Sequence, residues 1–142
     1  MTTTPLDSLV RVHKALGHPA RVRILAMLRG GELCVCQLNA VIGLAPSTIS
    51  AHLGELRDAG LVAERKQGRW VHYRLVAEDA TEAALAAVWP VLAGDAQVRD
   101  DAALLKGITK LPVEAICRPE FNLAALRKAC CPALPVRKRA RA

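Results

Sequence analysis

The sequence of 142 residues has very few aromatic side chains: two Trp, one Tyr and one Phe, or 3% of the chain. Its core must therefore be built from aliphatic side chains, which favours helices packed on helices. The sequence also lacks an apolar run of about 18 residues and the pattern of a secretory signal peptide. From these two absences we expect a cytoplasmic protein with no membrane partner.

The part of the chain before residue 118 also has little excess of positive over negative charge. The net charge is +7, which suggests a polyanionic partner, but residues 118–142 hold seven of the 20 Lys and Arg and one of the 13 acidic side chains. Such a basic tail is either a solvated end or a nonspecific contact with phosphates. An argument for nucleic-acid binding must therefore rest on local features.

What the chain has is apolar residues and cysteines. Apolar side chains make up 52% of the residues, enough for a core, and the length predicts one domain with an appendage. The five cysteines stand at positions 34, 36, 117, 130 and 131. In a reducing compartment such clusters are metal or metalloid ligands or redox thiols, rather than a disulfide framework.

Cys34 and Cys36 are separated by one residue. On a regular helix two side chains at this spacing point about 200° apart. Both thiols can therefore reach one small ligand only if the backbone departs from a helix between them.

The spacing of apolar residues predicts a mainly helical chain. Helices are expected over residues 6–16, 20–28, 38–42, 46–59, 85–92, 95–108 and 122–131. Pro90 should kink or end the helix that contains it. Between residues 62 and 75 the period changes to two, which predicts a β-hairpin that turns near Gly68.

Two short helices joined by a glycine-containing turn, followed by a hairpin, predict a winged helix-turn-helix. Unpaired apolar stripes on the first helix and on the helix after the wing predict a dimer. We therefore expect a DNA-binding and dimerisation domain over residues 1–110. Residues 111–142 would be a Cys-containing extension with a basic tail.

The predicted helix 46–59 has one face suited to a DNA groove. Ile49, Leu53 and Leu56 form its buried stripe, and the opposite face carries small or hydroxyl side chains that allow close approach to base edges and phosphates: Ser47, Thr48, Ser50 and Ala51. His52 is either a phosphate contact or a surface histidine without a role. Lys66 and Arg69 at the hairpin suit contacts with the DNA backbone. The alternative is a helical domain with a solvated polar face.

The stretches "ELCVCQL" and "PSTISAHLGELRDAGLVAERKQGRWVHYRL" resemble the ArsR/SmtB family of winged-helix metalloregulators, in particular its arsenical-resistance repressors. The resemblance covers roughly residues 6–90. It implies a homodimer, not an enzyme, that represses transcription from its own operator. The inducer it implies is trivalent arsenic (arsenite) or antimonite, bound by Cys34 and Cys36.

The third thiol of the family motif falls on Asn39, and an amide is a poor partner for arsenic. The site therefore either has two thiols or takes a third from the extension. Cys117, Cys130 and Cys131 are the candidates, with Cys130 and Cys131 favoured, and Cys117 and Cys130 also have a simpler interpretation as core residues. The full expected ligand set is Cys34, Cys36, Cys130 and Cys131.

Three rival interpretations remain at this point. A thiol-redox sensor would close Cys34–Cys36, or join Cys130 or Cys131 to another thiol. A constitutive architectural DNA binder would carry its cysteines incidentally. A thiol-disulfide enzyme is disfavoured because the chain has no C-x-x-C, and a zinc site is disfavoured because the four histidines show no ligand spacing.

Overall fold

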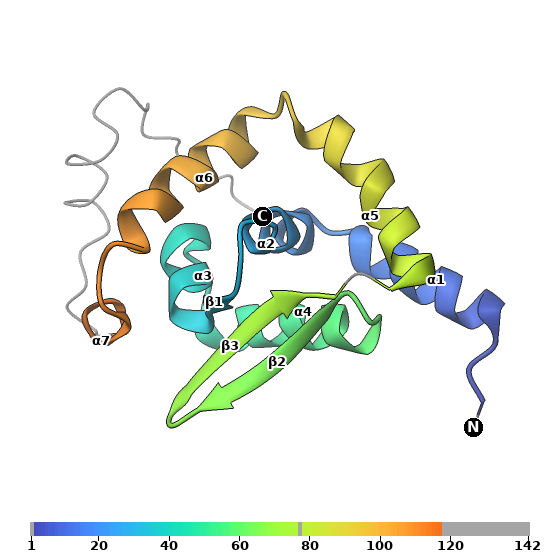
Figure 1. The fold of residues 1–142 in the computed structure, drawn as a ribbon, viewed down its shortest axis with the longest axis horizontal. Helices are drawn as coiled ribbons and strands as arrows, with labels where there is room; N and C mark the ends of the chain where they lie inside the picture. The colour runs from blue at the N-terminus through green and yellow to red at the C-terminus, as the bar shows by residue number, and fades with distance from the viewer. Residues whose placement is uncertain (1, 77, 118–142) are drawn as a thin grey trace.

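The computed structural model describes residues 2–76 and 78–117. Their elements, in chain order, are α1 (Pro5–Leu16), α2 (Pro19–Leu28), β1 (Leu33–Cys34), α3 (Val35–Ile42), α4 (Pro46–Asp58), β2 (Val62–Gln67), β3 (Trp70–Leu75), α5 (Asp79–Leu92), α6 (Ala96–Ile108) and α7 (Val113–Ile116). Figure 1 shows α2 near the centre of the molecule, with α5 and α6 on one side of it and the hairpin on the other. The predicted helix at 122–131 lies outside the described residues.

The predicted fold class is confirmed: the chain is mainly helical, and α3, α4 and the β2–β3 hairpin form a winged helix-turn-helix (Figure 1). The sheet has three antiparallel strands in the order β1-β3-β2. Leu33 pairs with Tyr73, and Cys34 pairs with His72. The two-residue strand β1 was not predicted, because two residues are too few to show a period.

Two glycines terminate elements at the positions expected from sequence. Gly43 follows α3 with a φ of 74°, and Gly68 lies in the hairpin turn with a φ of 59°. Both lie in the left-handed region that residues with a Cβ rarely adopt. The hairpin turn joins Gln67 to Trp70, which are paired across the two strands.

Pro90 does not stop α5, which continues to Leu92. The ring of a proline clashes with the preceding turn and lacks an N–H donor, so a helix tolerates it poorly away from its first turn. α5 accordingly ends less than one turn beyond Pro90. The prediction that the helix ends at Pro90 is therefore wrong, because the helix ends two residues later, at Leu92.

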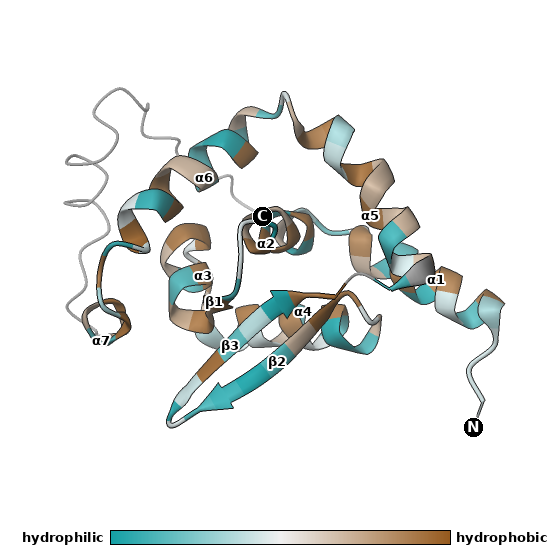
Figure 2. Ribbon diagram, in the orientation of Figure 1, coloured by the Kyte–Doolittle hydropathy of each residue, from teal (hydrophilic) through white to brown (hydrophobic). Residues whose placement is uncertain are grey.

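The core is aliphatic and centres on α2. The fully buried large aliphatic side chains are Ile24, Leu25 and Leu28 of α2, Leu38, Ile49, Leu53, Leu56, Leu61, Leu104 and Ile108. Figure 2 shows hydrophobic residues where the helices meet and hydrophilic residues along the hairpin. Burial of these side chains supplies most of the free energy that holds α4 and α6 against α2.

One charged group is buried in this core. The Asp101 side chain on α6 is 2% exposed and accepts two hydrogen bonds from Arg23 on α2, at 2.7 and 2.8 Å. It also accepts one from Gln97 at 3.0 Å. The bidentate pair fixes α6 against α2, because a buried carboxylate is tolerated only with its partners in place.

The apolar stripe predicted on α1 is exposed in the single chain. Leu6, Leu9 and Val10 are 69%, 55% and 43% exposed. On α5, Leu85 belongs to the core, whereas Val88, Trp89 and Leu92 are only partly covered. None of the helices in the described part of the chain has the length and apolar character needed to span a membrane.

Candidate functional site

Helix α4 has the two faces predicted for a helix that reads DNA. Ile49, Leu53 and Leu56 are fully buried, and the opposite face exposes Ser47, Thr48, Ser50 and Ala51. Ala45 precedes the helix and gives it no side-chain cap. Pro46 has no N–H, and the Thr48 N–H donates to the Ala45 carbonyl at 2.9 Å, so the Ser47 N–H is the group of the first turn left for an outside acceptor such as a phosphate oxygen.

His52 lies on α4 within a small basic cluster. Its Nδ1 accepts a hydrogen bond from Nε of Arg21 at 3.3 Å, and its ring centroid is 4.4 Å from that of His18. Burial, and then the charges of His18 and Arg21, lower the pKa of His52 below its usual value of 6.5. His52 is therefore neutral at pH 7, and the Arg21 guanidinium is a cation beside it. Sequence reasoning did not single out Arg21, whose neighbour His52 lies 31 residues away.

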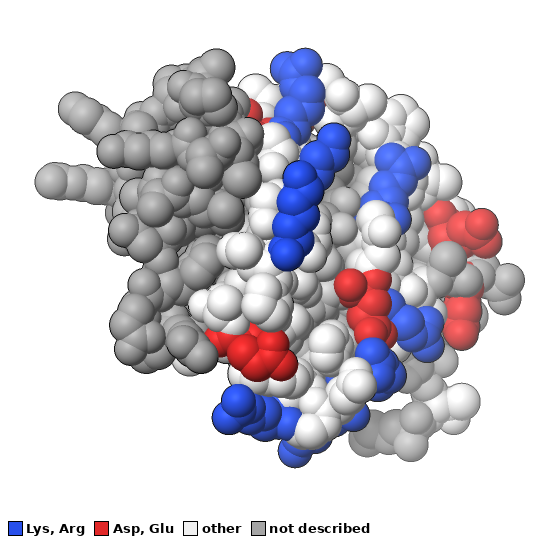
Figure 3. Space-filling view, turned by 60° about the vertical axis from the view of Figure 1, so that its left-hand side comes forward, with Lys and Arg blue, Asp and Glu red and all other residues white. Residues whose placement is uncertain are grey.

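The hairpin presents basic side chains at its tip. Lys66 and Arg69 are exposed, and the Arg69 guanidinium lies 4.7 Å from the centre of the Trp70 ring. Figure 3 shows Lys and Arg side chains at the lower end of the view, where the tip lies, with acidic side chains above them. A cation held at the end of a projecting hairpin can contact the DNA backbone.

Two carboxylates connect the hairpin to α4 and to the loop before β1. Glu64 accepts hydrogen bonds from the Tyr73 hydroxyl at 2.9 Å and from Arg57 of α4 at 3.2 Å. Burial and the hydrogen bond to Glu64 raise the pKa of Tyr73 to about 12, so the phenol keeps its proton. Glu32, in the loop before β1, forms an ion pair with Arg65 of β2.

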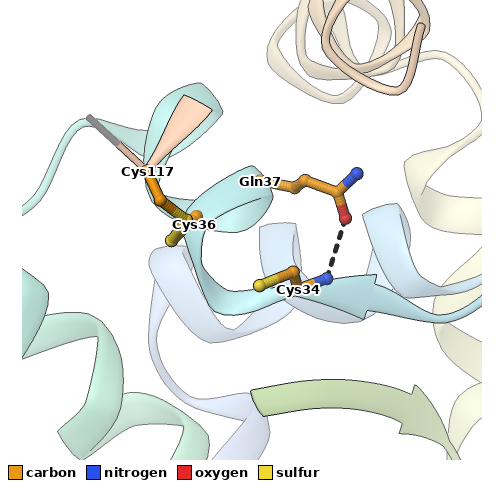
Figure 4. The surroundings of a disulfide bond; sticks show 4 residues. All are labelled: Cys34, Cys36, Gln37 and Cys117. Atoms are coloured by element: carbon orange, nitrogen blue, oxygen red, sulfur yellow. Dashed lines mark hydrogen bonds between the residues drawn. A yellow bond between two sulfur atoms is a disulfide. The ribbon is translucent and has the colours of Figure 1, made fainter. Parts of the chain in front are cut away.

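Three cysteines come together at the start of α3. The Sγ atoms of Cys34, Cys36 and Cys117 all lie within 4.8 Å of one another. Cys36 and Cys117 form a disulfide with their Cα atoms 5.5 Å apart, and Cys34 is a buried free thiol. In Figure 4 the Cys34 sulfur points toward this disulfide.

Cys34 and Cys36 lie on either side of a junction between a strand and a helix, so they do not share one regular helix. Cys34 is the last residue of β1, with extended φ and ψ of −75° and 150°, and α3 begins at the next residue. The Cys34 N–H donates to Oε1 of Gln37 at 2.8 Å (Figure 4). The departure from helical geometry that a shared ligand would require is therefore present at Cys34.

Cys117 follows α7, a single turn that packs against α3. Ile116 is 5% exposed and anchors this turn in the core, and the Cys117 N–H donates to the Val113 carbonyl at 3.0 Å. From the sequence, Cys117 was interpreted first as a core residue and was kept as an alternative third thiol; it is half-buried, with its sulfur at the thiol cluster. The favoured candidates Cys130 and Cys131 lie outside the described residues.

Asn39 stands one helical turn after Cys36, where the resemblance places a third thiol. Its Oδ1 is buried without a hydrogen-bond partner among the described residues. Over residues 2–76 and 78–117, the three cysteines are the one group of His, Cys, Asp or Glu with donor atoms close enough to hold an ion. With the Cys36–Cys117 disulfide reduced, three thiolates at this position would suit a soft, thiophilic ion.

The comparisons with known proteins agree with this architecture. The family model "Bacterial regulatory protein, arsR family" matches residues 18–64. One similar solved structure is the homodimeric winged helix-turn-helix DNA-binding domain of a possible ArsR-family transcriptional regulator from Mycobacterium bovis. It is 36% identical, has a TM-score of 0.54, and the match covers 62% of this chain and 82% of that one. The chain belongs to the ArsR family.

Two curated relatives of this ArsR-family chain carry names that refer to arsenic. An arsenic resistance transcriptional regulator of Pseudomonas putida is 46% identical over 65 residues, 45% of this chain and 51% of the relative. The arsenical resistance operon repressor of Escherichia coli is 45% identical over 67 residues, 46% of this chain and 57% of the relative. The chain thus spans little more than half the length of these two proteins.

These relatives are transcriptional regulators and not enzymes, as the sequence predicts. The family model covers Cys34, Cys36 and the whole of α4, but it ends before the hairpin tip and α6. Cys117 therefore lies outside the region that carries the family match.

Proposed function

We propose that this ArsR-family chain is a cytoplasmic, homodimeric repressor that leaves its operator when trivalent arsenic or antimony binds cysteine thiolates. The observation that carries the proposal is the placement of Cys34 and Cys36 at the junction of β1 and α3, beside a third sulfur. The same junction touches both parts of the DNA-binding surface. β1 pairs with the wing strand β3, and α3 packs on α4.

The DNA contacts proposed for α4 are Ser47, Thr48, Ser50 and Ala51, which face base edges and phosphates in the major groove. Lys66 and Arg69 contact the DNA backbone beside it, and His52 lines the same surface with Arg21 as its cationic neighbour. Double-stranded operator DNA is therefore the partner that this surface fits best.

The proposed dimer is supported by the exposed apolar side chains of α1 and by its neighbour α5, on which Val91 is 77% exposed. Apolar side chains gathered on two touching helices favour a self-complementary interface. The domain from Mycobacterium bovis is itself homodimeric. A two-fold axis would place two α4 helices on matching operator half-sites.

Release requires that the inducer bind the DNA-free conformation more tightly than the DNA-bound one. A coupling free energy of about 3 kcal/mol would lower operator affinity roughly 150-fold. When the thiols are drawn together, the start of α3 moves relative to β1. Because α3 packs on α4 and β1 pairs with β3, this movement also displaces α4 and the wing. The names of the relatives from Pseudomonas putida and Escherichia coli support arsenic as the inducer.

A thiol-redox sensor is the second candidate, and the disulfide between Cys36 and Cys117 favours it. In that function a peroxide takes two electrons and two protons from the two thiols, leaving the disulfide and two molecules of water. The bond would tie α7 to the start of α3.

The deciding experiment titrates fluorescent operator DNA bound to reduced full-length protein, first with arsenite and separately with hydrogen peroxide. We expect micromolar arsenite to release the DNA, and Cys34→Ser and Cys36→Ser to bind DNA normally without responding. Release by peroxide while arsenite has no effect would select the redox sensor instead. Unchanged DNA affinity with both reagents would leave an architectural DNA binder.

A further inference from the structure

We infer that Cys117 is the third thiol of the inducer site, so that each subunit holds a complete site made of Cys34, Cys36 and Cys117. This inference rests on the proposed function and specifies its ligand set. It replaces the expectation that the adjacent cysteines Cys130 and Cys131 reach the site, and it places the site within one subunit instead of across a dimer interface.

The distances support a single three-sulfur site. Metal–thiolate bonds of about 2.3 Å place neighbouring ligand sulfurs about 3.5–3.8 Å apart. The three Sγ atoms already lie within 4.8 Å of one another. Closing the remaining distance needs side-chain rotations and small backbone shifts, not a rearrangement of the fold.

The placement of Cys117 is fixed by packing on the rest of the domain. Ile116 and Leu111 pack into or against the core, and the bidentate pair between Arg23 and Asp101 holds α6, which leads into α7. The disulfide to Cys36 shows that the two side chains meet although 81 residues separate them in sequence. Reduction of that bond leaves these packing contacts in place and yields two thiols beside Cys34.

The chemistry of trivalent arsenic fits this partly buried position. A cellular thiol reductant first supplies two electrons and two protons to the Cys36–Cys117 disulfide. Arsenous acid then exchanges its three As–OH bonds for three As–S bonds. Each hydroxide leaves with one thiol proton, so three water molecules form and arsenic keeps its oxidation state.

The product of this exchange carries no net charge. This suits Cys34, which is 1% exposed, because a buried charge without partners is strongly disfavoured. A divalent ion bound by the same three thiolates would leave one negative charge in the core. The burial of the cluster therefore favours a trivalent metalloid over zinc.

The three ligands come from two parts of the chain whose relative position the inducer would fix. Cys34 and Cys36 flank the junction of β1 and α3, and Cys117 ends α7. Binding would hold α7 against the start of α3. It would thereby keep α3 and β1 from taking the positions that they have in the DNA-bound protein. Oxidation to the disulfide removes two of the three ligands, so the oxidised protein should not bind arsenite.

The first test identifies the ligands directly in the wild-type chain. Reduced full-length protein is incubated with or without arsenite and alkylated with iodoacetamide, and each cysteine is scored by peptide mass spectrometry. We expect arsenite to protect the half-buried Cys36 and Cys117 and to leave Cys130 and Cys131 fully alkylated, whereas Cys34, which is 1% exposed, should react little in either sample. Protection of Cys130 or Cys131 in place of Cys117, or of Cys36 without Cys117, would overturn the inference.

The second test compares matched variants in the operator-release assay. Cys117→Ser should raise the arsenite concentration for half-release by about 100-fold, since one of three bonds is lost. The double variant Cys130→Ser/Cys131→Ser should respond as the wild type does. Both should retain their operator affinity and circular dichroism without arsenite. If Cys117→Ser does not fold, the protection pattern of the wild type decides.

The two tests separate this inference from the function on which it rests. Protection of Cys36 and Cys117 without operator release would support the ligand set and reject arsenic-controlled repression. Operator release with a normal response of Cys117→Ser would support the repressor and reject Cys117 as a ligand. Absence of both protection and release would reject the two together.

Discussion

The DNA-reading surface and the thiol cluster are built in opposite ways. The reading surface is exposed and contiguous in sequence, with Ser47, Thr48 and Ser50 on one helix whose underside is fully buried. The thiol cluster is partly buried and joins residues 81 positions apart. Side chains that lie on one rigid helix move together when that helix moves. The thiol cluster joins separate elements, so a change in the cluster can shift that helix. The contrast suits a sensor that acts on DNA binding from a distance.

The largest effect on the stability of the fold should come from a substitution on the buried face of α4. Leu53→Ala removes a fully buried side chain that supports the reading surface, and we expect the free energy of unfolding to fall by about 2–5 kcal/mol. Ser47→Ala on the exposed face of the same helix should change it by less than about 0.5 kcal/mol. Urea unfolding followed by circular dichroism measures both. Similar losses for the two variants would show that α4 does not have one buried and one free face.

The next effect concerns the ion pair that holds α6, and with it α7 and Cys117, against α2. Asp101→Asn leaves Arg23 without its carboxylate, and we expect a loss of about 2–4 kcal/mol in unfolding free energy. Asp100→Asn makes the same chemical change one residue away and should cost less than about 0.5 kcal/mol. Thermal and urea unfolding of the two variants provide the measurement. Equal stability would contradict a structural role for the pair.

The helix and hairpin of the proposed reading surface could be predicted from local sequence, whereas the thiol cluster could not. Ile49, Leu53 and Leu56 repeat at helical spacing, and the hairpin alternates around Gly68, so local periodicity was enough to predict α4 and the β2–β3 hairpin. The meeting of Cys117 with Cys36 depends on the path of α6 and α7, which no local pattern specifies. The pair of Arg23 and Asp101 that fixes this path spans 78 residues. Strand β1 is too short to have a period, although it sets the geometry of Cys34.

A smaller effect separates the base-reading and backbone-contacting parts of the surface. Arg69→Ala should weaken binding to all DNA sequences several-fold and reduce the salt slope by about one unit, because one phosphate contact is lost. Ser50→Ala should instead change the preference among operator sequences. Fluorescence anisotropy over a range of salt concentrations distinguishes them. Arg99→Ala on α6, across the molecule from the hairpin (Figure 1), is the matched control for loss of one cation. An unchanged slope for Arg69→Ala would refute the wing assignment.

The smallest effect should come from the contact between the two regions. Glu32 precedes the strand that carries Cys34, and its carboxylate pairs with Arg65 of the hairpin. The hydrogen bond from Arg65 lowers the pKa of Glu32 below its usual value of 4.5. A carboxylate with a lowered pKa stabilises the fold above its usual pKa, and this contribution disappears as the pH falls through the lowered value.

Glu32→Gln should therefore be slightly less stable than the wild type at pH 7, and the difference should vanish once the pH is well below 4.5. It should also shrink with added salt, because the pair is exposed. Urea unfolding at several pH values, with Glu82→Gln on α5 as a control, tests this. A difference that persists at low pH would mean that packing of Glu32, and not its charge, joins the thiol junction to the wing. If the charge pair carries that connection, Glu32→Gln should bind arsenite normally yet release the operator less completely, because the strand and the hairpin would no longer move together.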